Sequence, residues 1–154
     1  METLKAPQVK FPPPVFYAVM IAAGVILDGL FPWHWQAGFY SRWIGAALMG
    51  IGLMLIAWAT MEFRRHQTTI LPHRPSSRII QVGPFLLSRN PIYLSFTLIQ
   101  IGIGILLGNI WILALIYPTL RIMVRHVIER EEAFLKQAFG QDYLDYMAKV
   151  RRWL

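Results

Sequence analysis

The sequence predicts an all-α, polytopic membrane protein with four transmembrane helices and a cytoplasmic helical segment at the C-terminus. Two observations lead to this prediction. Hydrophobic residues make up 56% of the 154 positions and charged residues only 15%, a composition far from that of a soluble domain. The apolar residues also gather in long runs with almost no charge, and a helix of about 20 apolar residues crosses the hydrocarbon core of a bilayer.

The first two spans are predicted at residues 15–31 and 43–61. Both runs nearly reach the length that a bilayer requires, and Asp28 is the only charged residue in either of them. A cleaved signal peptide is the alternative for the first run. The sequence that follows it, at residues 32–35, is a poor match to the small-residue pattern of a cleavage site, so a transmembrane helix is favoured.

The uncharged run at residues 90–120 is ambiguous, since it is too long for one ordinary span and too short for two complete ones. Gly108 and Asn109, near its middle, offer a turn. A single span would place the basic C-terminus outside the cytoplasm, against the positive-inside rule. We therefore predict two spans, at residues 92–107 and 110–127, with the second extending past the uncharged run.

Basic residues flank the predicted spans on one side, and Arg42 alone lies on the other. This distribution predicts an integral, multi-pass protein with both termini in the cytoplasm, in a prokaryotic inner membrane or the endoplasmic reticulum. The net charge of +7 lies beside the spans rather than along one soluble face, so anionic lipid headgroups are the expected partners, and nucleic acid is not. Nothing implies an obligate protein partner, and the absence of cysteine excludes a cysteine metal site. No metal is expected.

A single membrane domain is expected over residues 1–154, with a cytoplasmic loop at residues 62–91 and C-terminal helices at residues 128–154. The loop has about 30 residues, which exceeds the usual length in compact structures. It combines prolines with apolar residues, so we expect it to pack over another part of the protein. The alternative is a loop that lies on lipid headgroups with its arginines toward phosphate.

Two adjacent glutamates are the most unusual residues of the C-terminal segment. On a helix from about Ile128 to Phe139, Glu131 and Glu132 each fall on a stripe of apolar residues. A carboxylate in such surroundings needs a cationic partner, or it becomes neutral. The simplest partner for Glu132 is Lys136, four residues further on, and a positively charged ligand is the alternative.

Four segments of the second half of the chain form a specific set, although each is weak alone. They are Gly83-Pro84-Phe85, then Ser88-Arg89-Asn90-Pro91-Ile92-Tyr93, then Glu131-Glu132 with Leu135, and finally Phe139-Gly140 followed by Tyr143 and Tyr146. With these segments, the chain from about residue 63 to residue 154 resembles the isoprenylcysteine carboxyl methyltransferases. That family of integral membrane enzymes is related to the phospholipid N-methyltransferases.

The resemblance implies an S-adenosylmethionine-dependent methyltransferase that acts on a lipid-like or prenylated acceptor, with a carboxylate as one possible acceptor group. It implies that the cofactor binds on the cytoplasmic side. The residues implied to hold it are Arg89, Asn90, Pro91, Tyr93, Glu131 and Glu132. Carboxylates in a medium of low dielectric constant attract the sulfonium and ammonium groups of this cofactor, and an arginine suits its carboxylate.

The acceptor is expected to enter from the bilayer. Arg121 and Arg125 are candidates for orienting an anionic acceptor, and their alternative role is to anchor the fourth helix at the interface. An amine or hydroxyl acceptor would also need a general base, for which His66, His73 and His126 are the candidates.

Two departures from the family pattern leave the acceptor open. Asn90 stands where histidine is frequent, and Ser95 stands where glycine is common. Two other functions were weighed: an NADPH-dependent membrane reductase of related architecture, and a non-catalytic membrane subunit. A reductase would need several basic residues that converge on the phosphates of NADPH. The notable pair in the C-terminal segment is instead acidic, which favours a cationic cofactor.

Overall fold

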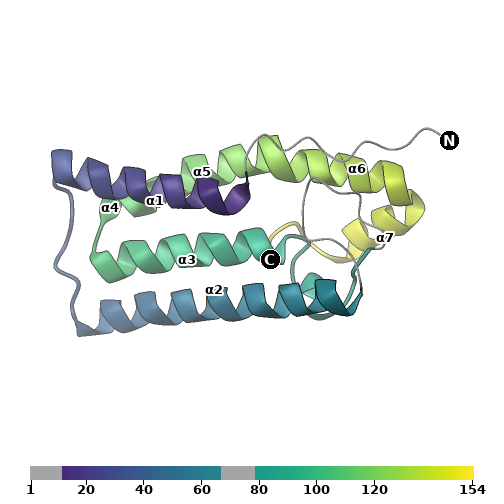
Figure 1. Ribbon diagram of the computed structural model, residues 1–154, viewed down its shortest axis with the longest axis horizontal. Coiled ribbons are helices and arrows are strands. Elements are labelled where there is room, and N and C mark those ends of the chain that lie inside the picture. The colour runs from purple at the N-terminus through teal and green to yellow at the C-terminus, as the bar shows by residue number, and fades with distance from the viewer. Residues whose placement is uncertain (1–11, 67–78) are drawn as a thin grey trace. The chain divides into compact units, whose positions relative to one another are not determined.

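The computed structural model describes residues 12–66 and 79–154 (Figure 1). These residues are helical apart from their connections, and the one β-bridge among them joins His34 to Asn109. They form two compact units. The unit that we call the apolar unit contains residues 12–54 and 93–122, and the unit that we call the polar unit contains residues 55–66, 79–92 and 123–154.

The apolar unit is built from helices with few polar residues. It contains α1 (Pro13–Leu30), the first part of α2 (Phe39–Arg65), most of α3 (Pro91–Leu107), α4 (Ile110–Ala114) and most of α5 (Ile116–Met123). Prolines occupy the first turn of α1, where a missing N–H leaves no hydrogen bond unmade. In Figure 1, α1 lies along α4, and the two helices are in contact.

Glycines bring α2 and α3 together within the apolar unit. A Cβ atom placed on Gly45 would lie 2.6 Å from the carbonyl oxygen of Gly102, and one placed on Gly52 would lie 2.8 Å from the carbonyl oxygen of Ser95. The two backbones are therefore too close for any side chain at these positions. In lipid, the burial of apolar surface contributes little to helix association, because the lipid tails are also apolar. Helices in a membrane therefore pack through small residues that let their backbones approach closely.

The turn predicted at Gly108 and Asn109 is confirmed. Gly108 has a φ of +65°, a backbone conformation that favours glycine. The Asn109 side chain then caps α4, because its Oδ1 accepts a hydrogen bond from the backbone N–H of Ile112 at 2.9 Å. The backbone N–H of Trp35 also donates to the Gly108 carbonyl oxygen, which ties the connection between α1 and α2 to this turn.

Within the described residues, three helical stretches are long and apolar enough to cross a membrane: α1, α2 and the stretch Ile110–Phe139. The helix α3 is apolar but shorter. The predicted spans at residues 15–31, 43–61 and 92–107 correspond to α1, α2 and α3, although α2 runs on to Arg65.

The membrane end of the last span at residue 127 stays a prediction, but the helix itself does not stop there. The helical stretch continues through the π-helix η2 (Val124–Ile128) into α6 (Glu129–Phe139). No glycine or proline lies between Arg121 and Phe139 to stop it.

The polar unit contains the last turns of α2, the 3₁₀ helix η1 (Gly83–Leu86), η2, α6 and α7 (Gln141–Lys149). As predicted, α6 ends at Gly140, which has a φ of +53°. Of the predicted loop at residues 62–91, residues 62–65 belong to α2 and residues 67–78 lie outside the described residues. The prediction of one domain over residues 1–154 stays a prediction.

Candidate functional site

Arg151 and Arg152, which follow the last helix, lie along the turn that precedes α3. We call these two residues the C-terminal strap. The backbone N–H of Arg89 donates to the carbonyl oxygen of Arg151 at 3.0 Å. The hydroxyl of Ser88 and the side-chain amide of Asn90 both donate to the carbonyl oxygen of Arg152 at 3.1 Å. These hydrogen bonds fix the backbone of the strap to the turn, and Ser88 is fully buried beneath it.

Glu132 projects from α6 and meets two arginines from distant parts of the sequence. Its Oε1 atom lies 3.3 Å from Nη2 of Arg89, whose side chain is 9% exposed. Arg152 donates to both carboxylate oxygens, from Nε at 3.1 Å and from Nη2 at 2.7 Å. Glu132 itself is only 5% exposed. We call this arrangement of one carboxylate between two guanidinium groups the carboxylate bridge.

The cationic partner predicted for Glu132 from spacing alone, Lys136, is therefore wrong. Helical spacing allows contact between residues four positions apart, but both oxygens of this carboxylate are taken by Arg89 and Arg152. A bidentate arginine contact is shorter and stronger than a single contact to a lysine ammonium.

Arg89 is left incompletely satisfied by the carboxylate bridge. Its Nε and Nη1 atoms are buried, and neither has a hydrogen-bond partner among the residues that the structure describes. A buried polar group without a partner costs about 1–3 kcal/mol. The bridge also carries two positive charges against one negative charge. An anionic group bound at Arg89 would accept from one of these N–H groups and balance the charge.

Tyr143 lies beside the bridge and is 2% exposed. Burial, and secondly the Glu132 carboxylate, raise the pKa of its hydroxyl to about 12, against the opposing effect of Arg89. The hydroxyl is therefore protonated at physiological pH. Burial likewise raises the pKa of Tyr146, whose hydroxyl donates to the carbonyl oxygen of Phe85 at 2.6 Å and so holds α7 against η1.

The structure brings several of the predicted cofactor residues together within the polar unit. Arg89, Asn90 and Glu132 meet at the strap, and Pro91 is buried where α3 begins. Glu131 is half-buried on α6 next to Glu132. Tyr93 belongs to the apolar unit, where its carbonyl oxygen accepts a hydrogen bond from the Tyr17 hydroxyl at 3.3 Å. The roles of all these residues toward a cofactor stay predictions.

The residues predicted for the acceptor also stay untested in their roles. Arg121 on α5 and Arg125 on η2 are both exposed. His126 is exposed on η2, His66 is half-buried after the end of α2, and His73 lies outside the described residues. The geometry of His66 is informative, because its Nδ1 atom lies 2.9 Å from the carbonyl oxygen of its own helix turn. A carbonyl only accepts, so Nδ1 carries the proton and Nε2 is free to accept one.

Sequence reasoning gave no site role to three residues of this region, although Tyr143 belongs to one of the motif segments. Arg152 and Tyr143 complete the surroundings of Glu132. Glu62, near the end of α2, is a second buried carboxylate, 6% exposed and paired with Arg65 at 3.3 Å. Arg152 lies 20 residues from Glu132, and no local pattern links residues at that separation. Glu62 could have been identified from the sequence, because it is a charged residue in an otherwise apolar helix.

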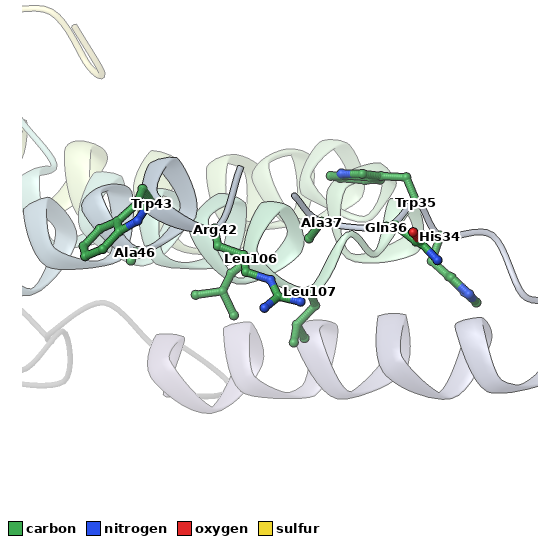
Figure 2. A pocket seen from close by; sticks show the side chains of 9 residues that line it. All are labelled: His34, Trp35, Gln36, Ala37, Arg42, Trp43, Ala46, Leu106 and Leu107. Atoms are coloured by element: carbon green, nitrogen blue, oxygen red, sulfur yellow. The ribbon is translucent and has the colours of Figure 1, made fainter. Parts of the chain in front are cut away.

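The apolar unit holds a hollow of about 630 Å³, formed by the α1–α2 connection, the start of α2 and the end of α3 (Figure 2). Trp35, Trp43 and Leu106 are among its lining residues. Its lining includes Arg42 but no carboxylate. A hollow of this kind does not attract a cation, so the carboxylate bridge is the better candidate for a cationic ligand.

Long apolar helices together with a buried carboxylate between two arginines define the class as a helical membrane protein with a charged internal site. Residues 40–142, more than half of the chain, match the phospholipid methyltransferase family, and the chain belongs to this family. The expected resemblance to the isoprenylcysteine carboxyl methyltransferase type is thereby confirmed. The family is one of methyltransferases, and the long apolar helices indicate an integral membrane protein.

Three relatives are similar over parts of the chain. The nickel-cobalt-cadmium resistance protein NccN of Alcaligenes xylosoxydans xylosoxydans is 26% identical over 130 residues, which cover 84% of this chain and 59% of that protein. The cobalt-zinc-cadmium resistance protein CzcN of Cupriavidus metallidurans is 26% identical over 101 residues, which cover 66% of this chain and 46% of that protein. An uncharacterized protein of Haemophilus influenzae is 39% identical over 64 residues, which cover 40% of this chain and 98% of that protein.

The chain thus spans about half the length of the two metal-resistance proteins that it matches. No solved structure matches it.

Proposed function

We propose that the protein is an S-adenosylmethionine-dependent methyltransferase that modifies a lipid-like or prenylated acceptor, with the amino acid end of the methyl donor bound at the carboxylate bridge. The observation that carries this proposal is the state of Arg89. Its guanidinium is buried and paired with Glu132, yet two of its nitrogen atoms have no partner in the described part of the chain. The family of the chain supports the reaction class.

The residues at the bridge fit the chemistry of this donor. Nε and Nη1 of Arg89 each offer an N–H group that a carboxylate oxygen can accept, and a hydrogen bond between two charged groups is stronger than one between neutral groups. Glu132, with Glu131 beside it, suits an ammonium or a sulfonium, and burial strengthens that attraction. When bound, S-adenosylmethionine supplies a methyl group activated by a positively charged sulfur. Asn90 and Pro91 shape the turn that bears Arg89, and Tyr93 is proposed to complete the site.

Methyl transfer is an in-line displacement at carbon, so the protein contributes mainly by positioning the reactants and excluding water. A carboxylate acceptor needs no base. An amine acceptor must first lose a proton, and Nε2 of His66 is the group best prepared to take it, since Nδ1 is committed to the carbonyl of Glu62. Arg121 or Arg125 would orient an anionic acceptor.

The proposed topology places this chemistry at the cytoplasmic face. Four spans would leave both termini in the cytoplasm, beside the basic residues that attract anionic headgroups. The acceptor would then reach the donor sideways from the bilayer. The proposal requires no protein partner, no nucleic acid and no metal.

The proposal is tested by titrating the detergent-purified full chain with S-adenosylmethionine and with NADPH. We expect binding of S-adenosylmethionine only. Glu132→Gln should weaken it about tenfold or more, because a hydrogen bond to a charged group contributes about 1.5–3 kcal/mol. Glu131→Gln should weaken it as well. Glu129→Gln, an exposed neighbour on the same helix, is the matched control and should leave the affinity unchanged.

Binding of NADPH in place of S-adenosylmethionine would favour a reductase and contradict the proposal. Indifference of S-adenosylmethionine binding to both glutamate substitutions would contradict the assigned site.

A further inference from the structure

Arg152 makes the shortest contact in the carboxylate bridge, although nothing in the family assignment gives it a role. We propose that Arg152 is an exchangeable counter-ion: its guanidinium occupies Glu132 until the ammonium of the methyl donor replaces it. Arg152 thereby sets the affinity for the donor. This inference rests on the proposed function, because it concerns the same site.

The occupancy of Glu132 is the first step of the argument. A carboxylate offers about four lone-pair positions. Three contacts already use them, two from Arg152 at 3.1 and 2.7 Å and one from Arg89 at 3.3 Å. The side chain of Glu132 is 7% exposed, so few directions of approach remain. An ammonium that binds this carboxylate must take a position that a guanidinium now holds.

The two arginines differ in how easily their side chains can leave Glu132. The side chain of Arg89 is 9% exposed, whereas that of Arg152 is 31% exposed. A partly exposed guanidinium regains water when it leaves its partner, but a buried one would keep its charge in the interior without that partner. Arg152 is therefore the partner that exchanges, and Arg89 is the partner that stays.

The movement is confined to a side chain. The carbonyl oxygen of Arg152 accepts hydrogen bonds from Ser88 and Asn90, and these bonds do not depend on where its guanidinium points. The strap can therefore keep its place along the turn while the side chain rotates away from Glu132. The displaced guanidinium, which is already 31% exposed, then returns to solvent.

The exchange lowers the apparent affinity for the donor, because only the fraction of molecules with a free position on Glu132 can bind it. Removing the Arg152 guanidinium should therefore strengthen binding by about three- to tenfold, the gain expected if about a third to a tenth of molecules are competent. A ligand that lacks the amino acid end does not compete with Arg152, and its affinity should not change.

The experiment compares two ligands on the detergent-purified full chain by calorimetric titration. S-adenosylmethionine carries the amino acid end, and 5′-methylthioadenosine lacks it. Arg152→Gln should lower the Kd of S-adenosylmethionine about three- to tenfold and leave that of 5′-methylthioadenosine unchanged. Arg151→Gln is the matched control, since only its backbone carbonyl takes part in the strap, and it should change neither Kd.

An Arg152→Gln variant that binds S-adenosylmethionine no better than the wild type overturns this inference, as does an equal change for both ligands. If that variant fails to fold, the same two titrations are made with Arg152→Lys. It keeps a charge but loses the two-pronged contact, so a smaller gain in the same direction is expected. A wild-type protein that does not bind S-adenosylmethionine overturns the proposed function, and this inference with it.

Discussion

At the scale of single residues, the polar unit shows how a charged group is kept in an apolar protein. Glu132 remains buried because Arg89 and Arg152 supply opposite charge from two directions. Such an arrangement costs desolvation and gives little stability compared with apolar packing, so its presence points to a use other than stability. The free N–H groups of Arg89 point the same way, because a purely structural bridge would have no reason to leave them unsatisfied.

The buried Tyr143 gives a prediction about pH. Its pKa is raised to about 12 in the folded protein, from 10.0, chiefly by burial and then by Glu132. The unfolded chain therefore releases this proton first as the pH rises. The stability that depends on the protonated hydroxyl is complete below about pH 10 and is lost between about pH 10 and 12. The loss amounts to about 2 kcal/mol.

The measurement is the thermal unfolding temperature of the detergent-purified protein between pH 8 and 12, wild type against Tyr143→Phe. We expect the wild type to lose stability more steeply than the variant above pH 10. Parallel curves would show that Tyr143 titrates as an ordinary tyrosine.

At the scale of elements, glycines decide where the helices turn and how closely they pack. Gly108 ends α3 with a φ of +65°, and a Cβ atom there would collide with the carbonyl oxygen of Trp35. Gly50 on α2 has nothing within 4 Å of the place that a Cβ atom would take. The two positions form a matched pair for substitution.

Gly108→Ala is expected to destabilise the protein by about 1–3 kcal/mol or more, since it adds backbone strain to a steric clash. Gly50→Ala should be neutral or slightly stabilising, because alanine is a better helix former than glycine. Thermal unfolding in detergent compares both variants with the wild type. Equal unfolding temperatures for the two variants would contradict the close approach at the Gly108 turn.

The helices also show which parts of the fold can be predicted from the sequence. Runs of apolar residues predict helices well, because the length of a span is set by the bilayer, and α1, α2 and α3 follow the predicted ranges closely. The helical stretch that begins at Ile110 continues past the predicted span end at residue 127 to Phe139, although its last part is rich in charge. Charge marks a change of environment, but it does not stop a helix.

The site was partly predictable for a similar reason. Glu132 could be identified because a carboxylate on an apolar stripe is a local anomaly. Its partners could not be identified, because Arg89 and Arg152 reach it through the path of the backbone, which no local spacing encodes. The family motifs supplied Arg89, but Arg152 lies beyond the residues that match the family.

At the scale of the whole molecule, the described chain combines two kinds of sequence, one in each compact unit. The long apolar helices suit a bilayer, and the charged internal site lies in the polar unit, built from the end of α2, the turn before α3 and the C-terminal helices. The family match at residues 40–142 draws on both units. The proposed function would use both kinds, since the proposed acceptor is apolar and the proposed donor is charged.

The central claim is that the carboxylate bridge receives the amino acid end of S-adenosylmethionine. The most direct test is an experimental structure of the full chain with this donor bound. We expect the donor carboxylate to accept from Nε or Nη1 of Arg89 and the donor ammonium to lie on Glu132, with the Arg152 side chain turned away. A donor bound elsewhere, with Arg152 still paired to Glu132, would contradict it.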